Sequence, residues 1–395
     1  MPSGAASAEP LARQRGRMPA DITLRGPGDV LAVLPYQLGY HPRDSIIAMS
    51  LRGRRVGLVV RTDLPLEGEV EATVTLLVEP LVRDGATSVL VVGYEDEPDA
   101  SSPALVALVE QVERKGIDVV DVVVVRDGRR YSPICSDPCC PPDGIALPDP
   151  ADVPGVAEFV ARGRSPLVSR DAVEALVAPD PSACKAVGEA LLARAGMPGR
   201  RGRSAAAWRV LLRRERTKPG DRGAGGPPQP SAPVVADAVL GLADIAWRDG
   251  LVAWLAPGVL PAGLLDSSVL TLLRRELPTW AGMGLPHRPR RGRRLRGAEP
   301  YDDDGVERQE LLQRLLALCR SVPDEHPDEA AALCTVTAHV AWESGDGAVA
   351  RAAVDRARRL APGYRLAQLL ERLVEHGVRL PADGGRDGPA TAWVG

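Results

Sequence analysis

An almost continuous run of branched aliphatic residues, IDVVDVVVV at 117–125, restricts the fold more than any other feature of the sequence. Branched side chains favour extended backbone, and a strand that is apolar at nearly every position has to be covered on both faces. A sheet with helices on both sides meets that requirement. We therefore expect an α/β architecture around this strand.

The residues around this run alternate between strand and helix patterns. Strand patterns cover 45–51, 56–63 and 87–93, and apolar residues at helical spacing cover 70–81 and 103–115. Arg52-Gly53-Arg54 and Asp127-Gly128 predict hairpin turns. The order of elements predicts an N-terminal α/β domain at 21–150 with a mixed, mostly parallel sheet.

The strand signal ends near Pro154, and helical patterns follow. We expect a helical region at 151–217, a proline- and glycine-rich linker at 218–233, and a helical domain at 234–380 with a basic loop at 287–300. Residues 1–20 and 381–395 are predicted to be disordered tails. The predicted fold class is thus an α/β domain followed by an all-α region.

The clearest helical periodicity lies near the C-terminus. Ala330–Trp342 and Ala348–Leu360 each predict a helix, and Gly345-Asp346-Gly347 predicts the turn between them. The spacing in the second helix is typical of a tetratricopeptide repeat, and it is carried by Ala350, Val354, Ala357 and Pro362. An ordinary helical hairpin that packs through small residues explains the same pattern. Either interpretation makes the C-terminal helices a candidate surface for a protein partner.

Charge and targeting signals exclude several classes of protein. The net charge is −3 and the isoelectric point is about 6.1, so no overall positive field attracts DNA or RNA. The start of the chain lacks the apolar segment of a secretory signal, and no run approaches the roughly 18 apolar residues of a membrane span. We therefore expect a cytoplasmic protein with reduced cysteines and no membrane partner.

The segment His287–Arg296, HRPRRGRRLR, concentrates positive charge within the basic loop. Its arginines could neutralise phosphates, but no aromatic residue interleaves them for base stacking. Asp302, Asp303 and Asp304 follow closely and can neutralise the run. We interpret the loop as a solvated segment and expect no nucleic-acid partner.

A group of polar residues surrounds a short helix predicted at 29–38. It consists of Arg25, Gly28, Asp29, Tyr36, His41, Asp44 and Ser45. A glycine-rich turn before a helix can bind an anion, and an arginine adds a bidentate donor for phosphate or carboxylate. Gly-Pro-Gly-Asp, however, matches neither the P-loop nor the dinucleotide fingerprint, and the same residue types are typical of helix caps and turns. A ligand site and structural turn chemistry both remain open.

Three cysteines, Cys135, Cys139 and Cys140, lie close together in the sequence. Zinc sites usually contain Cys-x-x-Cys pairs and four ligands, whereas the spacing here is Cys-x-x-x-Cys-Cys without a nearby fourth cysteine or histidine. Three interpretations are open: a metal site that recruits Asp137, a redox-active vicinal pair, and small residues buried in a tight loop.

Four stretches of the chain carry a family resemblance. They are LRGPGDVLAVLPYQLGYHPRDSIIAMSLRGRRVGLVVRTDLP near the start, CSDPCCPPDG at 135–144, LADIAWRDGLVAWL at 242–255, and AWESGDGAVARAAVDRARRLAPGYRLAQLL in the terminal helices. Together they resemble an actinobacterial family known as domain of unknown function 4192. The resemblance implies one bacterial architecture over nearly the whole chain, with variation at 213–233 and 287–300. It implies no activity.

No signature of a zinc protease, α/β-hydrolase, P-loop protein or kinase occurs, so we predict no catalytic residue and no cofactor. The leading hypothesis is a non-enzymatic cytoplasmic interaction or regulatory protein, because the helical end could offer a groove to a partner. The alternative is a small-anion or nucleotide-handling enzyme that uses the segment 25–45.

Overall fold

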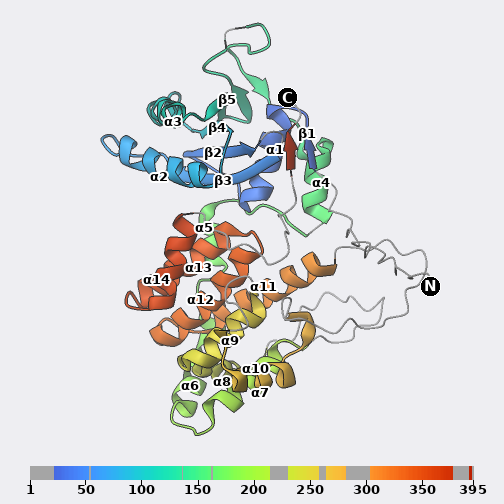
Figure 1. Cartoon of the computed structure of the whole chain (residues 1–395), viewed down its shortest axis with the longest axis vertical. Coiled ribbons are helices and arrows are strands. Elements are labelled where there is room, and N and C mark those ends of the chain that lie inside the picture. The colour runs from blue at the N-terminus through green and yellow to red at the C-terminus, as the bar shows by residue number, and fades with distance from the viewer. Residues whose placement is uncertain are drawn as a thin grey trace, which may run out of the picture.

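The computed structural model describes residues 22–52, 55–135, 137–161, 163–213, 230–257, 264–281, 303–376 and 391–393. These residues form an α/β region and a helical region that follow one another along the long axis of the molecule (Figure 1). The predicted tail at 1–20, the basic loop at 287–300 and most of the predicted linker lie outside the described residues.

An eight-stranded sheet with the order β1-β8-β3-β2-β4-β5-β6-β7 forms the centre of the α/β region. Its strands are β1 (Ile22–Leu24), β2 (Ser45–Arg52), β3 (Arg55–Asp63), β4 (Ser88–Tyr94), β5 (Asp118–Arg126), β6 (Arg129–Tyr131), β7 (Ile145–Ala146) and β8 (Thr391–Trp393). Among the described strands, only β1–β8 and β4–β5 pair in parallel. The sheet is mixed as predicted, but it is mostly antiparallel, so the prediction of a mostly parallel sheet was wrong.

The connections explain this correction. β2–β3 and β5–β6 are hairpins, as the turn residues predicted, and a hairpin joins antiparallel strands. The crossover through α2 (Val70–Arg83) carries the chain from β3 to β4, but β4 pairs with β2 instead of β3. Only the crossover through α3 (Ser102–Arg114) connects the two parallel neighbours β4 and β5.

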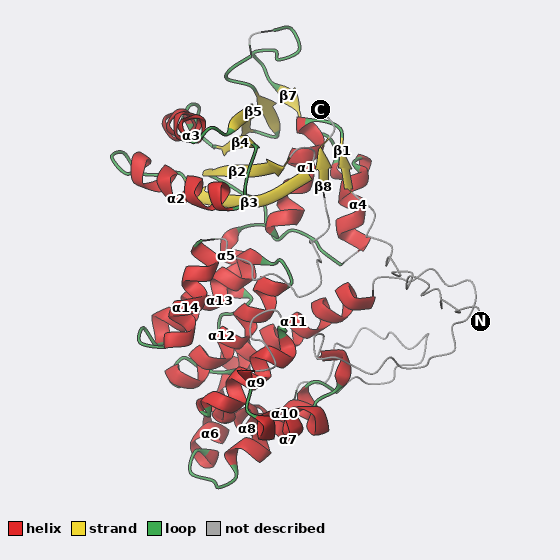
Figure 2. Cartoon of the chain, in the orientation of Figure 1, coloured by secondary structure: helices red, strands yellow, loops and turns green. Residues whose placement is uncertain are grey.

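Helices cover both faces of the sheet, as the apolar run in β5 requires (Figure 2). α1 (Pro27–Leu38) and α4 (Pro154–Ala161) pack on the face that carries Ile47 and Met49. α2 and α3 pack on the face that carries Ile46 and Ala48. Because α4 packs on the sheet, the α/β region continues past residue 150, where the sequence analysis ended it.

Strand β8 lies between β1 and β3 through backbone pairing. Its residues, 391–393, belong to the segment that the sequence analysis assigned to a disordered tail. The structure instead brings this short piece of the C-terminus back to the first strand of the chain.

The helical region has its own continuous core. Its helices are α5 (Arg170–Ala175), α6 (Pro181–Arg194), α7 (Arg200–Leu211), α8 (Ala232–Leu240), α9 (Ile245–Leu255), α10 (Ser267–Glu276), α11 (Asp303–Ser321), α12 (Pro327–Glu343), α13 (Gly347–Leu360) and α14 (Arg365–Glu375), with short 3₁₀ turns at Pro150–Asp152, Gly241–Ala243 and Thr279–Ala281. Trp208, Trp247 and Trp254 are fully buried there, and α12 lies at the centre with residues 330–341 all buried. α12 and α13 match the two helices predicted at 330–342 and 348–360.

Candidate functional site

Three of the seven residues nominated in the sequence lie at the N-terminal end of α1. Asp29 accepts a hydrogen bond from the backbone N–H of Arg25 at 3.0 Å, so its carboxylate stabilises the turn into the helix. The Arg25 residue is exposed. A Cβ placed on Gly28 would lie 3.6 Å from the Pro148 ring, so this glycine contacts the loop before α4. These contacts are those of a helix start.

Tyr36 lies in the last turn of the same helix. Its ring centroid is 6.3 Å from that of Phe159 on α4, with the planes tilted by 47°. A tilted aromatic pair at this distance stabilises packing between helices. Tyr36 therefore joins α1 to α4 on one face of the sheet.

The other three nominated residues follow the C-terminal end of α1, which Gly39 closes with a left-handed φ of 84°. The backbone N–H of His41 donates to the carbonyl of Leu167 at 2.9 Å, and His41 is exposed. Asp44 accepts from the backbone N–H of Asp96 at 3.1 Å. Ser45 begins β2 and is completely buried.

A helix of 12 residues separates these two groups. At 1.5 Å per residue its length is about 18 Å, so Arg25, Gly28 and Asp29 lie far from His41, Asp44 and Ser45. The structure therefore distributes the nominated residues over both ends of α1 instead of bringing them to one cleft.

The C-terminal end of α1 is where the two regions of the molecule meet. Tyr40 is buried in the hydrophobic core of the helical region, and the Arg61 guanidinium lies 5.8 Å from its ring. Burial raises the pKa of Tyr40. Asp63 binds Arg61 at 2.5 Å and Arg170, at the start of α5, at 2.9 Å. Sequence reasoning missed these residues, although Tyr40 stands next to the nominated His41.

Ser45 and Tyr94 form an unusual pair within this end of the sheet. They are directly opposite each other on β2 and β4, and both side chains are buried. Neither hydroxyl has a hydrogen-bond partner in the described part of the chain. Burial raises the pKa of Tyr94, which keeps its hydroxyl protonated. A buried hydroxyl without a partner is costly, so this pair is available to a water or a small ligand.

Next to Tyr94, Glu95 binds the loop that leads into α3. Its carboxylate accepts from the backbone N–H and the hydroxyl of Ser101, at 2.8 and 2.6 Å, and from Arg126 at 2.8 Å. The chain leaves the parallel pair β4–β5 here, at the carboxyl ends where open α/β sheets often bind ligands. Glu95, however, is occupied by internal contacts.

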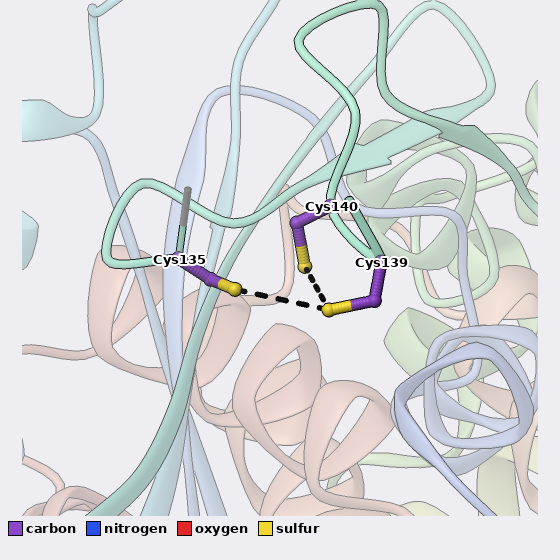
Figure 3. Close-up of side chains that lie close together, drawn as sticks. All are labelled: Cys135, Cys139 and Cys140. Carbon is purple, nitrogen blue, oxygen red and sulfur yellow. Dashed lines mark hydrogen bonds between the residues drawn. The ribbon is translucent and has the colours of Figure 1, made fainter. Parts of the chain in front are cut away.

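A different cluster lies in the loop between β6 and β7. The Sγ atoms of Cys135, Cys139 and Cys140 point toward one another, with 3.9 Å from Cys139 to each of the other two (Figure 3). All three sulfurs lie within 4.8 Å of one another. Cys139 is exposed and the other two are partly buried. We refer to residues 132–135 and 137–144 as the thiol loop.

A family model described as domain of unknown function (DUF4192) matches residues 27–279 and 276–380. The chain belongs to this family. The match confirms the resemblance inferred from the sequence, and it covers both regions and the thiol loop of this DUF4192 protein. No curated protein and no solved structure matches the chain.

Two hollows on the described surface lie away from both clusters. One, of about 240 Å³, is lined by Glu79, Val82, Arg83 and Lys115. The other, of about 550 Å³, is lined by Arg209, Val210, Arg213, Glu276, Leu277, Pro278 and Trp280. None of the described helices combines the length and the apolar character needed to cross a bilayer.

Proposed function

We propose that this DUF4192 protein is a non-enzymatic regulatory protein that binds a partner protein through its C-terminal helices. The observation that carries the proposal is a leucine stripe on α14, formed by Leu366, Leu369 and Leu373. Leu369 is 48% exposed, and the two other leucines, one turn away on either side, are half-buried. The adjoining face of α14, with Ala367 and Leu370, is buried in the helical core.

The position of this stripe supports a partner helix as the ligand. α12 and α13 pack against each other as a helical hairpin, and α14 packs against both as a third helix. The tetratricopeptide-like geometry expected from the sequence is part of this proposal. In stacked helical repeats each unit buries an apolar face against the next, and a terminal helix has a polar outer face. The leucine stripe gives α14 the apolar outer face of an internal helix. An amphipathic helix of another protein would complete the packing.

The cytoplasm is the proposed location. All six cysteines of the chain are free thiols, which is typical of a reducing compartment. A cytoplasmic regulator would meet its partner without crossing a membrane.

Co-purification from the native host tests the proposal. We expect the full chain to retain one reproducible protein that Leu369→Arg loses, because a charge on the stripe opposes apolar docking. Leu76→Arg on α2 is the matched control, since Leu76 is 70% exposed but lies in the α/β region. Loss of the protein from both variants, or from neither, would contradict the proposed surface.

The alternative, a small-anion or nucleotide-handling enzyme, is favoured by one observation. The hydroxyls of Ser45 and Tyr94, which have no hydrogen-bond partner among the described residues, belong to facing residues of β2 and β4, and Ser45 is part of the nominated segment. A ligand held there at 100 times its dissociation constant would stabilise the fold by roughly 2.7 kcal/mol. Thermal-shift measurements with nucleotides and phosphorylated metabolites would show this gain, and Ser45→Ala should abolish it. If no compound shifts the melting temperature, the enzyme hypothesis loses its support.

A further inference from the structure

The thiol loop is a series of three tight turns. Backbone hydrogen bonds close the turns from Cys135 to Ser132 at 3.4 Å, from Cys140 to Asp137 at 2.8 Å and from Gly144 to Pro141 at 2.8 Å. Cys135 and Cys140 each end a closed turn, and Cys139 lies within the second turn. The three sulfurs point toward one another (Figure 3).

The base of the loop is held firmly by β6. The Arg129 guanidinium donates to the carbonyls of Asp143 and Gly144 at 2.7 and 2.9 Å. Gly144 has a left-handed φ of 69°, and a Cβ there would lie 2.7 Å from the Tyr131 ring. The loop is therefore attached closely to the sheet, which limits how far the sulfurs can separate.

The spacing of the sulfurs fits a common metal ion. Zinc–sulfur bonds of about 2.3 Å in a tetrahedral arrangement place neighbouring sulfurs about 3.8 Å apart. Two of the three Sγ–Sγ distances are 3.9 Å, and the third is no longer than 4.8 Å. A disulfide needs sulfurs at about 2.05 Å and joins only two of the three. The triangle is thus suited to one shared cation.

Charge repulsion among the three sulfurs also favours a bound cation. Three thiolates this close together repel one another unless a cation lies between them. A bound divalent metal ion supplies that charge and deprotonates the coordinating thiols.

We propose that Cys135, Cys139 and Cys140 bind one thiophilic divalent cation of the zinc type through three thiolates, with the fourth position open to water. Each thiol that coordinates releases one proton, so up to three protons leave as one cation binds. The exposure of Cys139 leaves room for the fourth ligand. The thiol loop lies on the side of the sheet away from the helical region (Figure 1), so this inference does not depend on the proposed partner surface.

Titration of the reduced, metal-free full chain with Co²⁺ tests the site. We expect an intense thiolate-to-cobalt absorption that saturates at one equivalent and disappears when Zn²⁺ is added. Cys139→Ser should weaken Zn²⁺ binding by more than about 100-fold, the upper end of the loss seen when a supporting residue of a metal site is removed. Cys184→Ser, which changes a buried thiol of the helical region, should leave the titration unchanged.

The proposal is overturned if the reduced wild-type chain shows no cobalt absorption, or if Cys139→Ser keeps the wild-type affinity. A disulfide among the three cysteines, without cobalt binding by the reduced chain, would instead identify a redox pair. X-ray absorption of the zinc-loaded wild type gives a readout that needs no variant. Three sulfurs at about 2.3 Å support the site, and a shell of nitrogen and oxygen alone refutes it.

Discussion

The α/β region and the helical region each contain a buried charged side chain that gathers several hydrogen bonds, which we call a hub, and these two hubs have opposite signs. In the α/β region the hub is Glu95, which is 4% exposed, and in the helical region it is Arg356, which is 2% exposed. Glu95 lies at the N-terminal end of α3, where its carboxylate accepts from backbone and side-chain donors. Arg356 lies against carbonyls at the ends of other helices.

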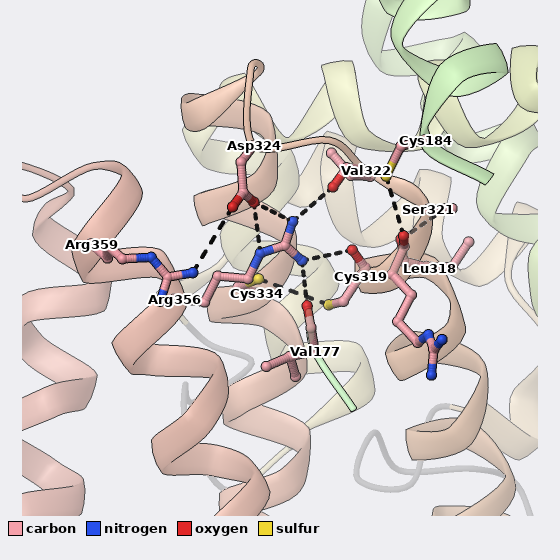
Figure 4. Close-up of polar contacts among 11 residues, drawn as sticks. Val177, Cys184, Leu318, Cys319, Ser321, Val322, Asp324, Cys334, Arg356 and Arg359 are labelled. Atoms are coloured by element: carbon pink, nitrogen blue, oxygen red, sulfur yellow. Dashed lines mark hydrogen bonds and ion pairs between the residues drawn. The ribbon is translucent and has the colours of Figure 1, made fainter. Parts of the chain in front are cut away.

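Figure 4 shows that the guanidinium of Arg356 is surrounded by hydrogen-bond acceptors. It donates to the carbonyls of Cys319 and Val322, at the C-terminal end of α11, and to Val177 after α5, at 2.7, 2.7 and 2.5 Å. Asp324 accepts two more bonds at 2.7 and 3.0 Å. Helix N-termini favour negative charge and helix C-termini favour positive charge. The comparison teaches that each of these two buried charges lies at helix ends of the opposite polarity. There it bonds to backbone N–H or C=O groups that have no partner within their own helix.

The largest expected effect comes from removing the cationic hub. Arg356→Met removes the guanidinium donor from three buried carbonyls and leaves Asp324 with the more distant Arg359, at 3.9 Å, so it should lower the free energy of unfolding by about 3–5 kcal/mol. Denaturant unfolding measures this loss. Arg351→Met is the matched control on α13, because its ion pair with Asp355 is partly exposed and should contribute about 0–1 kcal/mol. Equal losses of unfolding free energy in both variants would contradict the special contribution of Arg356.

The second largest effect is a pH-dependent loss of about 3 kcal/mol in the free energy of unfolding, and it arises from His339 in the helical region. Burial lowers the pKa of His339 from 6.5 to about 4, with Arg248 adding to the shift and Asp249 opposing it. The neutral ring hydrogen-bonds the carbonyl of Thr335 at 2.8 Å. Since the folded-state pKa lies below the unfolded one, this stability is present above about pH 6.5 and is lost as the pH falls toward 4.

Unfolding measured between pH 7 and pH 4 checks this. His339→Gln should remove the part of the pH dependence that His339 supplies, whereas His41→Gln, an exposed site in the α/β region, should leave it unchanged. If the wild type and His339→Gln lose stability in parallel, the buried histidine is not the cause.

Glu95 should contribute somewhat less to the free energy of unfolding than Arg356, because its partner Arg126 is 21% exposed. Glu95→Ala leaves the N–H and hydroxyl of Ser101 without an acceptor and should cost about 2–3 kcal/mol. Glu97→Ala, at an exposed neighbouring position, should change stability by less than about 0.5 kcal/mol. A loss as large as that of Arg356→Met would show that the two hubs are equivalent.

The smallest loss of unfolding free energy is expected from a substitution at the contact between the two regions. Arg164 donates to the carbonyl of Ser344 at 2.7 Å across the junction, and Arg164→Met should cost about 0.5–1.5 kcal/mol. Calorimetry shows whether the regions unfold together. We expect the variant to separate the two transitions further, because fewer contacts then couple them. A single unchanged transition would mean that the other junction contacts, including those of Tyr40 and the Asp63–Arg170 ion pair, couple the regions without Arg164.

Local patterns predicted most of the elements. β2, β3, β4, β5 and α13 agree with the predicted elements to within a residue or two, and α12 begins three residues before its predicted start. The agreement is close because alternation and helical periodicity depend on near neighbours in the chain. The pairing order could not be derived in this way. Two arrangements, β4 beside β2 or β4 beside β3, satisfy the same sequence pattern, and only packing distinguishes them.

The candidate sites show the same limit. Residues 25–45 are adjacent in sequence, but the length of α1 separates their functional groups. Glu95 was missed because a single acidic residue after a strand has no periodicity, although its place at the carboxyl end of β4 was a usable signal. The three cysteines were noticed from their spacing, yet their convergence depends on three turns that bend the loop back on itself.

By itself, the sequence determined the α/β start, the helical end and the identity of most helices and strands, since each depends on the polarity of residues a few positions apart. Only the tertiary structure decided which strands are neighbours, which charges are buried and which thiols meet. Those outcomes join residues that are distant in the chain, and their free energy comes from burial and pairing that exist only after the regions have packed.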